Sequence, residues 1–291
     1  MNHISTDIYI NNLDHLLMVS KKCMIAGLPS SGKSTYIGAL WYNLCNSNKN
    51  MLMSAGELPV QIELLEKLGD LWQKIQKIER SSTEQNVVDN VLINLKVKQT
   101  GQEIALSVPD FWGEKFYNII DQNNTDEIVE WCKEADSLFY MVYDVSNGLF
   151  YDDDTMEKES EEENDVPPLE TKNMSSSAIN IMVLKYLFSH KKFKRLVLAI
   201  TRWDDVTNNG NDPENPEEWL KSKSPALYNF VKHNYPDALI VGLSAQGCDY
   251  DKNNWNKDDM LEKTENGVRA FVNDANGICY DLSKPLNYLM Q

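Results

Sequence analysis

The segment that most constrains this chain is residues 27–35, which read GLPSSGKST. It fits the pattern G-x-x-x-x-G-K-[ST], follows a short apolar strand at residues 22–26, and precedes a helix with apolar residues at helical spacing. Glycines at these positions let successive backbone N–H groups turn inward around a phosphate at a helix N-terminus. The segment therefore predicts a phosphate-binding loop in an α/β fold.

Two side chains of this loop have predicted roles. Lys33 is expected to reach the β- and γ-phosphate oxygens, and the Ser34 hydroxyl is expected to coordinate Mg²⁺. Pro29 removes one amide donor from the loop. The loop by itself does not distinguish ATPases, kinases and GTPases. Its predicted nucleotide-binding residues are Gly27, Ser30, Ser31, Gly32, Lys33, Ser34 and Thr35.

The next segment carries a second candidate motif. An apolar pattern over residues 60–79 predicts an amphipathic helix, and residues 91–98 and 103–108 predict a hairpin of two strands. The second strand runs into Asp110-Phe-Trp-Gly113. Asp110 could hold Mg²⁺ through water, and the Gly113 amide could contact a γ-phosphate.

The rest of the chain alternates strands and helices. Predicted strands at 137–145, 195–200 and 238–243 are separated by predicted helices at 175–190 and 216–233. A helix at 126–135 precedes these strands, and a small hairpin over 268–280 and a helix near 283 follow them. This order predicts a six-stranded, mostly parallel sheet with one antiparallel strand and helices on both faces. Ligand loops are then expected at the carboxyl ends of the strands.

Four motifs in order, GLPSSGKS, DFWG, TRWD and SAQ, each follow a strand. The series resembles the guanine-nucleotide motifs of Ras-like and Gα-like P-loop GTPases of the TRAFAC class, and the resemblance covers residues 21–247. It implies the Ras-like fold and bound GTP or GDP with Mg²⁺. The base contacts that it implies are Thr201, Arg202, Asp204, Ser244 and Ala245.

The chemistry of the base explains this set. The Asp204 carboxylate can accept from both N1–H and the 2-amino group of guanine, whereas adenine offers only C2–H there. Arg202 replaces the usual lysine of the family, and its planar guanidinium can stack on the base. By resemblance, the Ala245 amide donates to guanine O6.

The predicted catalytic residues are Lys33, Glu114 and Arg80. Glu114 stands where the family usually has glutamine; an ionised glutamate can accept from water but repels the γ-phosphate. Hydrolysis is then slow, or Glu114 acts as a base with a raised pKa, or it is a solvated loop carboxylate. Arg80 and Thr83 resemble the Arg-x-x-Thr of Gα proteins, which implies an arginine finger and a metal-binding threonine. Alternatively, Arg80 contacts the C-terminal end of the preceding helix. The predicted metal ligands are Ser34, Thr83 and Asp110.

These motifs favour a guanine-nucleotide switch that hydrolyses GTP to GDP with Mg²⁺. The alternatives are a GTP-binding scaffold with little or no hydrolysis and, less favoured, an ATP-dependent P-loop enzyme. The segment GKSTYIGALW, the Gly-Glu pair and the C-terminal pattern are similar to bacterial GTPases of the double-GTPase type. That resemblance implies a role in conflict and antiviral defence systems.

Domain boundaries follow from the same motifs. We expect an N-terminal lead segment at 1–20 and a GTPase domain at 21–247, into which a helix at 60–79 and an acidic loop at 152–165 are inserted. Residues 248–291 are expected to complete the same domain with a hairpin and a helix.

Charge and composition narrow the expected partners. The formal net charge is −16, and residues 152–165 hold nine carboxylates and one lysine, a local charge of −8. This balance argues against binding nucleic acid or an anionic membrane. A protein effector or regulator is the expected partner besides the nucleotide. The sequence shows no long apolar run, no basic, apolar leader and five scattered cysteines, so a cytoplasmic location is expected.

Overall fold

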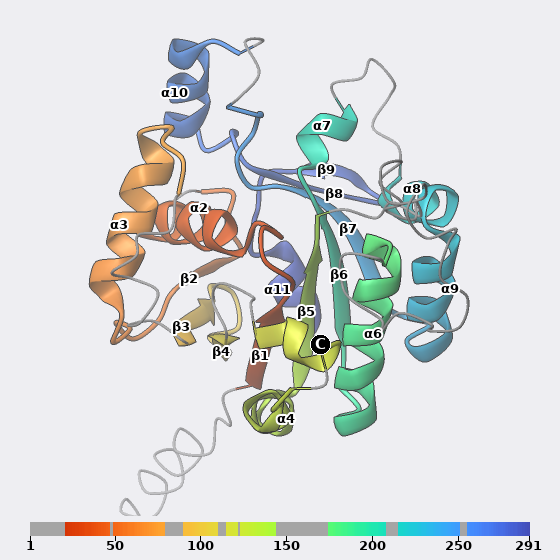
Figure 1. Ribbon diagram of the computed structural model, residues 1–291. Coiled ribbons are helices and arrows are strands. Elements are labelled where there is room, and N and C mark those ends of the chain that lie inside the picture. Colours follow the sequence, from red (N-terminus) through yellow and green to blue (C-terminus); the bar gives the residue numbers. More distant parts are fainter. Residues whose placement is uncertain are drawn as a thin grey trace, which may run out of the picture.

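The computed structural model describes residues 21–46, 49–78, 90–109, 115–121, 123–143, 174–207, 215–250 and 255–291. These residues form one nine-stranded sheet in the order β2-β3-β4-β1-β5-β6-β7-β8-β9 (Figure 1). The strands are β1 (Lys21–Ala26), β2 (Met53–Ala55), β3 (Asn90–Val97), β4 (Glu103–Pro109), β5 (Ser137–Val142), β6 (Leu196–Thr201), β7 (Leu239–Ser244), β8 (Phe271–Asp274) and β9 (Gly277–Cys279).

The sheet has a parallel centre and antiparallel margins. Strands β4, β1, β5, β6 and β7 pair in parallel. At one margin, β3 pairs antiparallel with β4, and β2 pairs antiparallel with β3. At the other margin, β8 pairs antiparallel with β7, and β9 pairs antiparallel with β8. The prediction of six mostly parallel strands is therefore wrong. All six are present, but three-residue β2 is too short to give a periodic signal, and the hairpin of β8 and β9 extends the sheet because it pairs with the edge of β7.

Helices cover both faces of the sheet, as expected, and each face has its own apolar core (Figure 1). On one face lie α2 (Lys33–Cys45), α3 (Ile62–Gln73) and α11 (Lys284–Leu289). On the other lie η1 (Lys115–Ile119), α4 (Asp126–Glu134), α6 (Ser176–His190), α8 (Pro216–Lys223) and α9 (Pro225–Asn234). The central strands β5 and β6 are buried along their whole length, which explains their continuous apolar sequence.

Two predicted helices differ from the structure in extent. The helix expected over 216–233 is two helices, because Pro225 follows Ser224 and starts α9 with a new first turn. The helix expected over 60–79 is confirmed as α3 but is shorter. Two further helices, α7 (Trp203–Thr207) and α10 (Lys257–Glu265), were not predicted, and both are short.

The C-terminal segment packs against the strand that leads to the phosphate loop. Leu286 and Leu289 of α11 are buried in the same core as Cys23 and Ile25 of β1. The Tyr36 hydroxyl of α2 donates to the Leu282 carbonyl at 2.9 Å. Residues at the two ends of the described chain therefore share one core.

None of the helices among the described residues combines the length and the apolar character needed to cross a bilayer.

Candidate nucleotide-binding site

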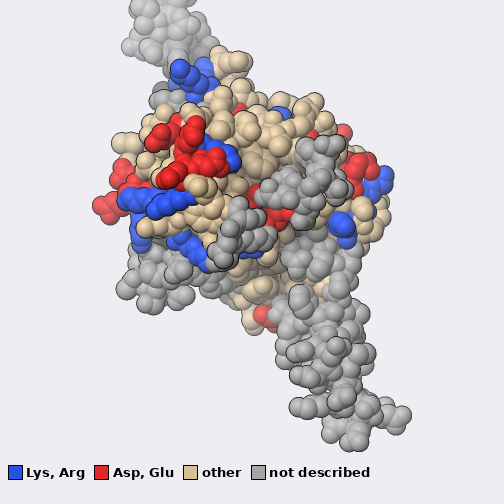
Figure 2. Space-filling model, turned by 90° about the horizontal axis from the view of Figure 1, so that it is seen from above, with Lys and Arg blue, Asp and Glu red and all other residues tan. Residues whose placement is uncertain are grey.

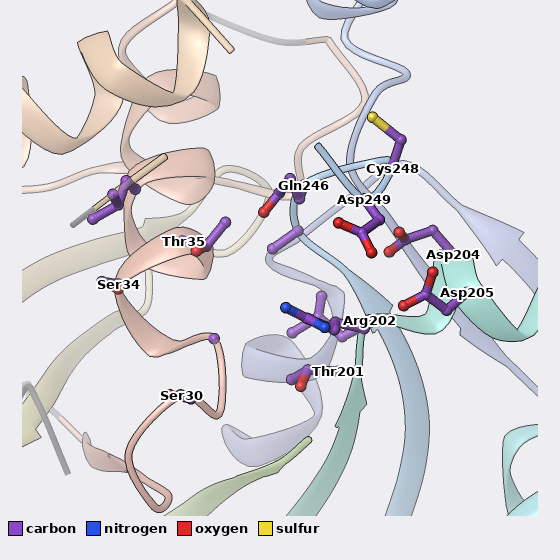
Figure 3. Close-up of a pocket in the computed structure, with 14 residues that line it drawn as sticks. Ser30, Ser34, Thr35, Thr201, Arg202, Asp204, Asp205, Gln246, Cys248 and Asp249 are labelled. Atoms are coloured by element: carbon purple, nitrogen blue, oxygen red, sulfur yellow. The ribbon is translucent and has the colours of Figure 1, made fainter. Parts of the chain in front are cut away.

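One pocket lies at the carboxyl ends of β1, β6 and β7, where the rule for open α/β sheets places ligands. In Figure 3, Ser34 and Thr35 of α2 stand on one side, and the carboxylates of Asp204, Asp205 and Asp249 gather on the other. The lining residues are Ser30, Gly32, Ser34, Thr35, Ile78, Thr201, Arg202, Asp204, Asp205, Leu243, Ala245, Gln246, Cys248 and Asp249.

The phosphate loop has the backbone of an anion cradle. Ser30 and Gly32 both have left-handed φ angles, 62° and 86°, and Gly32 caps α2. Alternation of this kind turns successive N–H groups toward one side of the loop. Gly27 is needed for another reason, since a Cβ there would lie 2.5 Å from the Met141 carbonyl oxygen. The loop therefore fits a phosphate group at the N-terminus of α2.

Lys33 is buried within this loop. Its ammonium donates to the Gly27 carbonyl at 2.5 Å, to the Leu28 carbonyl at 3.0 Å and to the Ser31 hydroxyl at 3.4 Å. All of these acceptors lie within six residues of Lys33 in the sequence. Phosphate oxygens are stronger acceptors for an ammonium than these three neutral groups.

The base side of the pocket meets the phosphate loop at Thr201. The side chain of Thr201 lies 3.7 Å from the position that a Cβ would take on Gly32, and its hydroxyl donates to the Val142 carbonyl at 3.2 Å. Thr201 is therefore fixed between β5 and the loop.

Arg202 follows in an uncommon left-handed conformation, with φ 54°. Its guanidinium stacks at 4.4 Å on the ring of Tyr143 and donates to the Tyr143 hydroxyl at 2.8 Å. In Figure 3 the guanidinium points into the pocket. The arrangement gives the pocket a planar cation on the wall between β5 and β6.

Asp204 is a buried carboxylate, 4% exposed, at the start of α7. Its Oδ1 accepts from the Ser244 hydroxyl at 2.6 Å, and the Ser244 oxygen accepts from the Gly247 amide at 3.0 Å. Burial raises the pKa of Asp204, and the hydrogen bond from Ser244 partly offsets that rise. Two donors from a base, together with Ser244, would satisfy such a carboxylate.

Trp203 fixes the backbone next to Asp204. The indole is fully buried and lies over Gly242 of β7, where a Cβ would come within 2.2 Å of the ring. Gly242 is therefore the residue that makes room for α7. No signal in the sequence indicated this contact.

The fit of a guanine nucleotide and of Mg²⁺ can be tested on the donor set. The pocket has loop residues at one end and a buried carboxylate acceptor at the other. The predicted residues Gly27, Ser31 and Lys33 belong to the loop but do not line the pocket themselves. The loop donors and the carboxylate together match a nucleotide that has phosphates and a base with paired donors. Ser34 supplies a hydroxyl at the phosphate end. The sequence-predicted residues that lie outside the described residues are Arg80, Thr83, Asp110, Gly113 and Glu114, and the acidic loop 152–165 lies outside them as well.

Sequence reasoning missed several residues at the pocket. Asp205, Gln246, Cys248 and Asp249 line it beside the predicted residues. Asp205 adjoins Asp204, and Gln246 is the last residue of the SAQ motif, so the motifs could have indicated both. Nothing in the sequence marks Cys248 or Asp249. Burial raises the pKa of the Cys248 thiol to about 11, so the thiol is protonated at neutral pH.

The surface around this edge of the sheet carries both signs of charge. Figure 2, seen from above, shows patches of Lys and Arg next to patches of Asp and Glu on the described part of this face. The formal charge of −16 is therefore not spread as one uniform field over the face.

Fold and pocket together define a nucleotide-binding α/β protein of the P-loop class. The family comparison then gives the family directly. The model of the family described as Double-GTPase 1 matches residues 24–289, so the chain belongs to the Double-GTPase 1 family. Membership of this GTPase family supports guanine-nucleotide binding by the chain. No curated protein matches the sequence.

The solved structures that match the chain are distant in sequence. The Ski7 GTPase-like domain of S. cerevisiae, bound to GDP and inorganic phosphate, is 16% identical with a TM-score of 0.45, over 85% of this chain and 48% of that chain. The bacterial selenocysteine-specific elongation factor EF-Sec is 13% identical with a TM-score of 0.36, over 84% of this chain and 28% of that chain. The SRb-GTP/SRX complex of the signal recognition particle receptor from Chaetomium thermophilum is 12% identical with a TM-score of 0.40, over 80% of this chain and 94% of that chain. The chain thus spans about half of the Ski7 structure and about a quarter of EF-Sec.

Proposed function

We propose that this chain is a guanine-nucleotide switch that hydrolyses GTP to GDP and phosphate with Mg²⁺. The observation that carries the proposal is that the two ends of the pocket lie close together. Thr201 lies next to the phosphate loop, 3.7 Å from where a Cβ on Gly32 would be, and Asp204, three residues later, holds a buried carboxylate at the base end. A nucleotide with phosphates in the loop would therefore present its base to Asp204.

The described residues have distinct tasks in this proposal. Lys33 and the loop amides bind the β- and γ-phosphates, and Ser34 is the described residue proposed to hold the ion, which would neutralise charge on the phosphates. Asp204 accepts from the two donors of guanine, while Arg202 stacks on the base plane. Arg80, Thr83, Asp110, Gly113 and Glu114 complete the site as predicted from the sequence, with Glu114 next to the attacking water. A role in defence systems, implied by the resemblance, would use the switch through a protein effector.

Asp204→Asn tests base recognition. Asparagine keeps one acceptor for N1–H but places an amide donor opposite the 2-amino group of guanine, and that donor pairs instead with the 2-oxo group of xanthine. We expect affinity for GTP to fall roughly 100-fold and affinity for XTP to rise, as measured by calorimetric titration. The control is Asp237→Asn. Asp237 is exposed and lies shortly before the first residue of β7, at the end of the strand away from the pocket. Tighter binding of ATP than of GTP by the unmodified protein would contradict the proposal.

Single-turnover hydrolysis tests the enzymatic part. The switch requires Mg²⁺-dependent release of phosphate from bound GTP, with a rate that changes in Glu114→Gln. A scaffold would show no turnover in either form, with or without Mg²⁺, while still binding GTP. That result would leave guanine recognition in place and remove the hydrolase.

A further inference from the structure

Arg269 is a buried arginine held by neutral groups. Only 2% of it is exposed, and its guanidinium packs 4.1 Å over the ring of Trp72. Burial lowers the pKa of Arg269. The acceptors of its hydrogen bonds are the Gln246 carbonyl at 3.0 Å, the Trp72 carbonyl at 2.7 Å, the Thr264 hydroxyl at 3.2 Å and the Tyr250 hydroxyl. A buried cation is costly unless it is hydrogen-bonded, and the rigid fork of donors of Arg269 bonds all four of these acceptors.

Two hydrogen bonds connect Arg269 and its neighbour Trp72 to the base end of the pocket. Trp72, at the end of α3, donates from its indole nitrogen to the Ala245 carbonyl at 2.7 Å. Arg269 donates to the next carbonyl, that of Gln246. Ser244, before them, is held in β7 by pairing with Phe271 of β8. The backbone on both sides of the Ala245 amide is therefore fixed.

Gly247 closes the turn at residues 244–247 directly on Arg269. It has a φ of 86°, and a Cβ there would lie 2.7 Å from the Arg269 carbonyl oxygen and 2.9 Å from Arg269 Cγ. Its amide donates to the Ser244 hydroxyl, which donates in turn to Asp204. The same turn thus holds the carboxylate and the amide that face the base.

We propose that Trp72 and Arg269 are positioning residues that determine purine specificity, because they hold the 244–247 turn with the Ala245 amide facing position 6 of the base. The inference rests on the proposed guanine site and deepens it. Guanine has an acceptor at position 6, whereas adenine has an amino group there, which would oppose the amide donor. A fixed amide rejects adenine; an amide that can turn away accommodates it.

Trp72→Phe tests this inference with little change in packing. The variant keeps an aromatic ring for Arg269 and removes the donor to Ala245. The full chain would be titrated with GDP, IDP and ADP by calorimetry, because diphosphates leave hydrolysis out of the measurement. We expect GDP and IDP to bind roughly 3- to 10-fold more weakly while ADP is unchanged or tighter, so that the GDP:ADP preference shrinks. The GDP:IDP preference, which reports on Asp204, should stay constant.

Matched controls and a second variant keep the test decisive. Trp131→Phe on α4 removes an indole nitrogen from the opposite face of the sheet and should leave all three affinities unchanged. If Trp72→Phe does not fold, Tyr250→Phe takes its place in the test. It removes one acceptor of Arg269 and should also shrink the GDP:ADP preference. Arg269→Lys should do so more strongly, whereas Arg195→Lys, at the other end of β6, should not.

Three outcomes count against the inference. Equal loss of GDP and ADP binding would show a merely structural role, and unchanged affinities for both would show that the turn holds itself. In both cases the guanine preference of the unmodified protein leaves the proposed function standing. If the unmodified protein does not prefer GDP to ADP, the proposed function fails together with the inference.

Discussion

The phosphate end of the pocket, residues 27–35, and the base end, residues 201–204 and 244–247, are supported in different ways. Lys33 is held by carbonyls of its own loop, six residues away or fewer. At the base end, Trp72 and Ala245 are separated by 173 residues, and Arg269 and Trp72 by 197. The proposed phosphate end therefore has contacts that are local in sequence, whereas the proposed base end has contacts from α3 and the C-terminal segment. The predictions below separate the two ends, in order of expected effect.

Lys33→Met should disable the phosphate end alone. Methionine fills a similar volume but cannot donate to phosphate oxygens, so we expect affinity for GDP and ADP alike to fall roughly 100-fold or more. Because the base end is intact, the ratio of the two affinities should be nearly unchanged. Calorimetric titration measures both, with the exposed Lys192→Met as control. A change in the GDP:ADP ratio would mean that the two ends are coupled.

Gly242→Ala should disrupt the base end through packing. The new Cβ would lie 2.2 Å from the Trp203 ring, and overpacking of this kind lowers the free energy of unfolding by about 1–3 kcal/mol. Urea unfolding would measure the loss. Gly69→Ala in α3 is a matched control, because its Cβ would lie no closer than 3.6 Å to its neighbours and alanine favours a helix. Equal stability of the two variants would contradict the packing of Trp203 described above.

Acid should weaken the base end before the phosphate end. Burial raises the pKa of Asp204, so in the nucleotide-free protein it gains a proton at a higher pH than an exposed aspartate does. A protonated carboxyl cannot accept from both donors of guanine. The GDP:ADP ratio should therefore fall as the pH is lowered through the raised pKa, by at most about tenfold per pH unit.

The raised pKa of Asp204 also makes the free energy of unfolding depend on pH. Because the folded pKa lies above the unfolded value, the folded state binds more protons between them. The contribution of Asp204 to stability accordingly increases as the pH falls from the folded pKa to the unfolded one, and it is smallest above both. A GDP:ADP ratio that is independent of pH, or equally dependent on pH in Asp204→Asn, would contradict this assignment.

Tyr143→Phe should have the smallest effect. It removes the acceptor for Arg202 but keeps the ring under the guanidinium, and Tyr143 is 43% exposed, so water can replace the lost contact. We expect roughly twofold weaker binding of GDP and ADP, because stacking does not distinguish the purines. Tyr143→Ala, which also removes the ring, should weaken binding further. If it does not, Arg202 does not need Tyr143 as a platform.

The phosphate end and the base end of the pocket also differ in how much of each could be predicted from the sequence. The phosphate loop, its strand and its helix were confirmed as elements because their signal lies in consecutive residues. Strand β2 and the place of the C-terminal hairpin in the sheet were not predictable, since pairing across an edge leaves no periodic pattern. Trp72 and Arg269 looked like ordinary members of polar or amphipathic segments. Their contacts depend on which remote segments meet, and a single sequence carries no record of that.

The packing of α11 beneath β1 has a consequence for synthesis on the ribosome. The strand that carries the phosphate loop emerges early, but its core is completed by Leu286 and Leu289, which emerge more than 250 residues later. Until then β1 has an uncovered apolar face, of the kind that chaperones bind and that aggregates. Nucleotide should therefore be able to stabilise the chain only after residue 289 has left the ribosome, so residues 21–289 are expected to fold as one unit rather than stepwise.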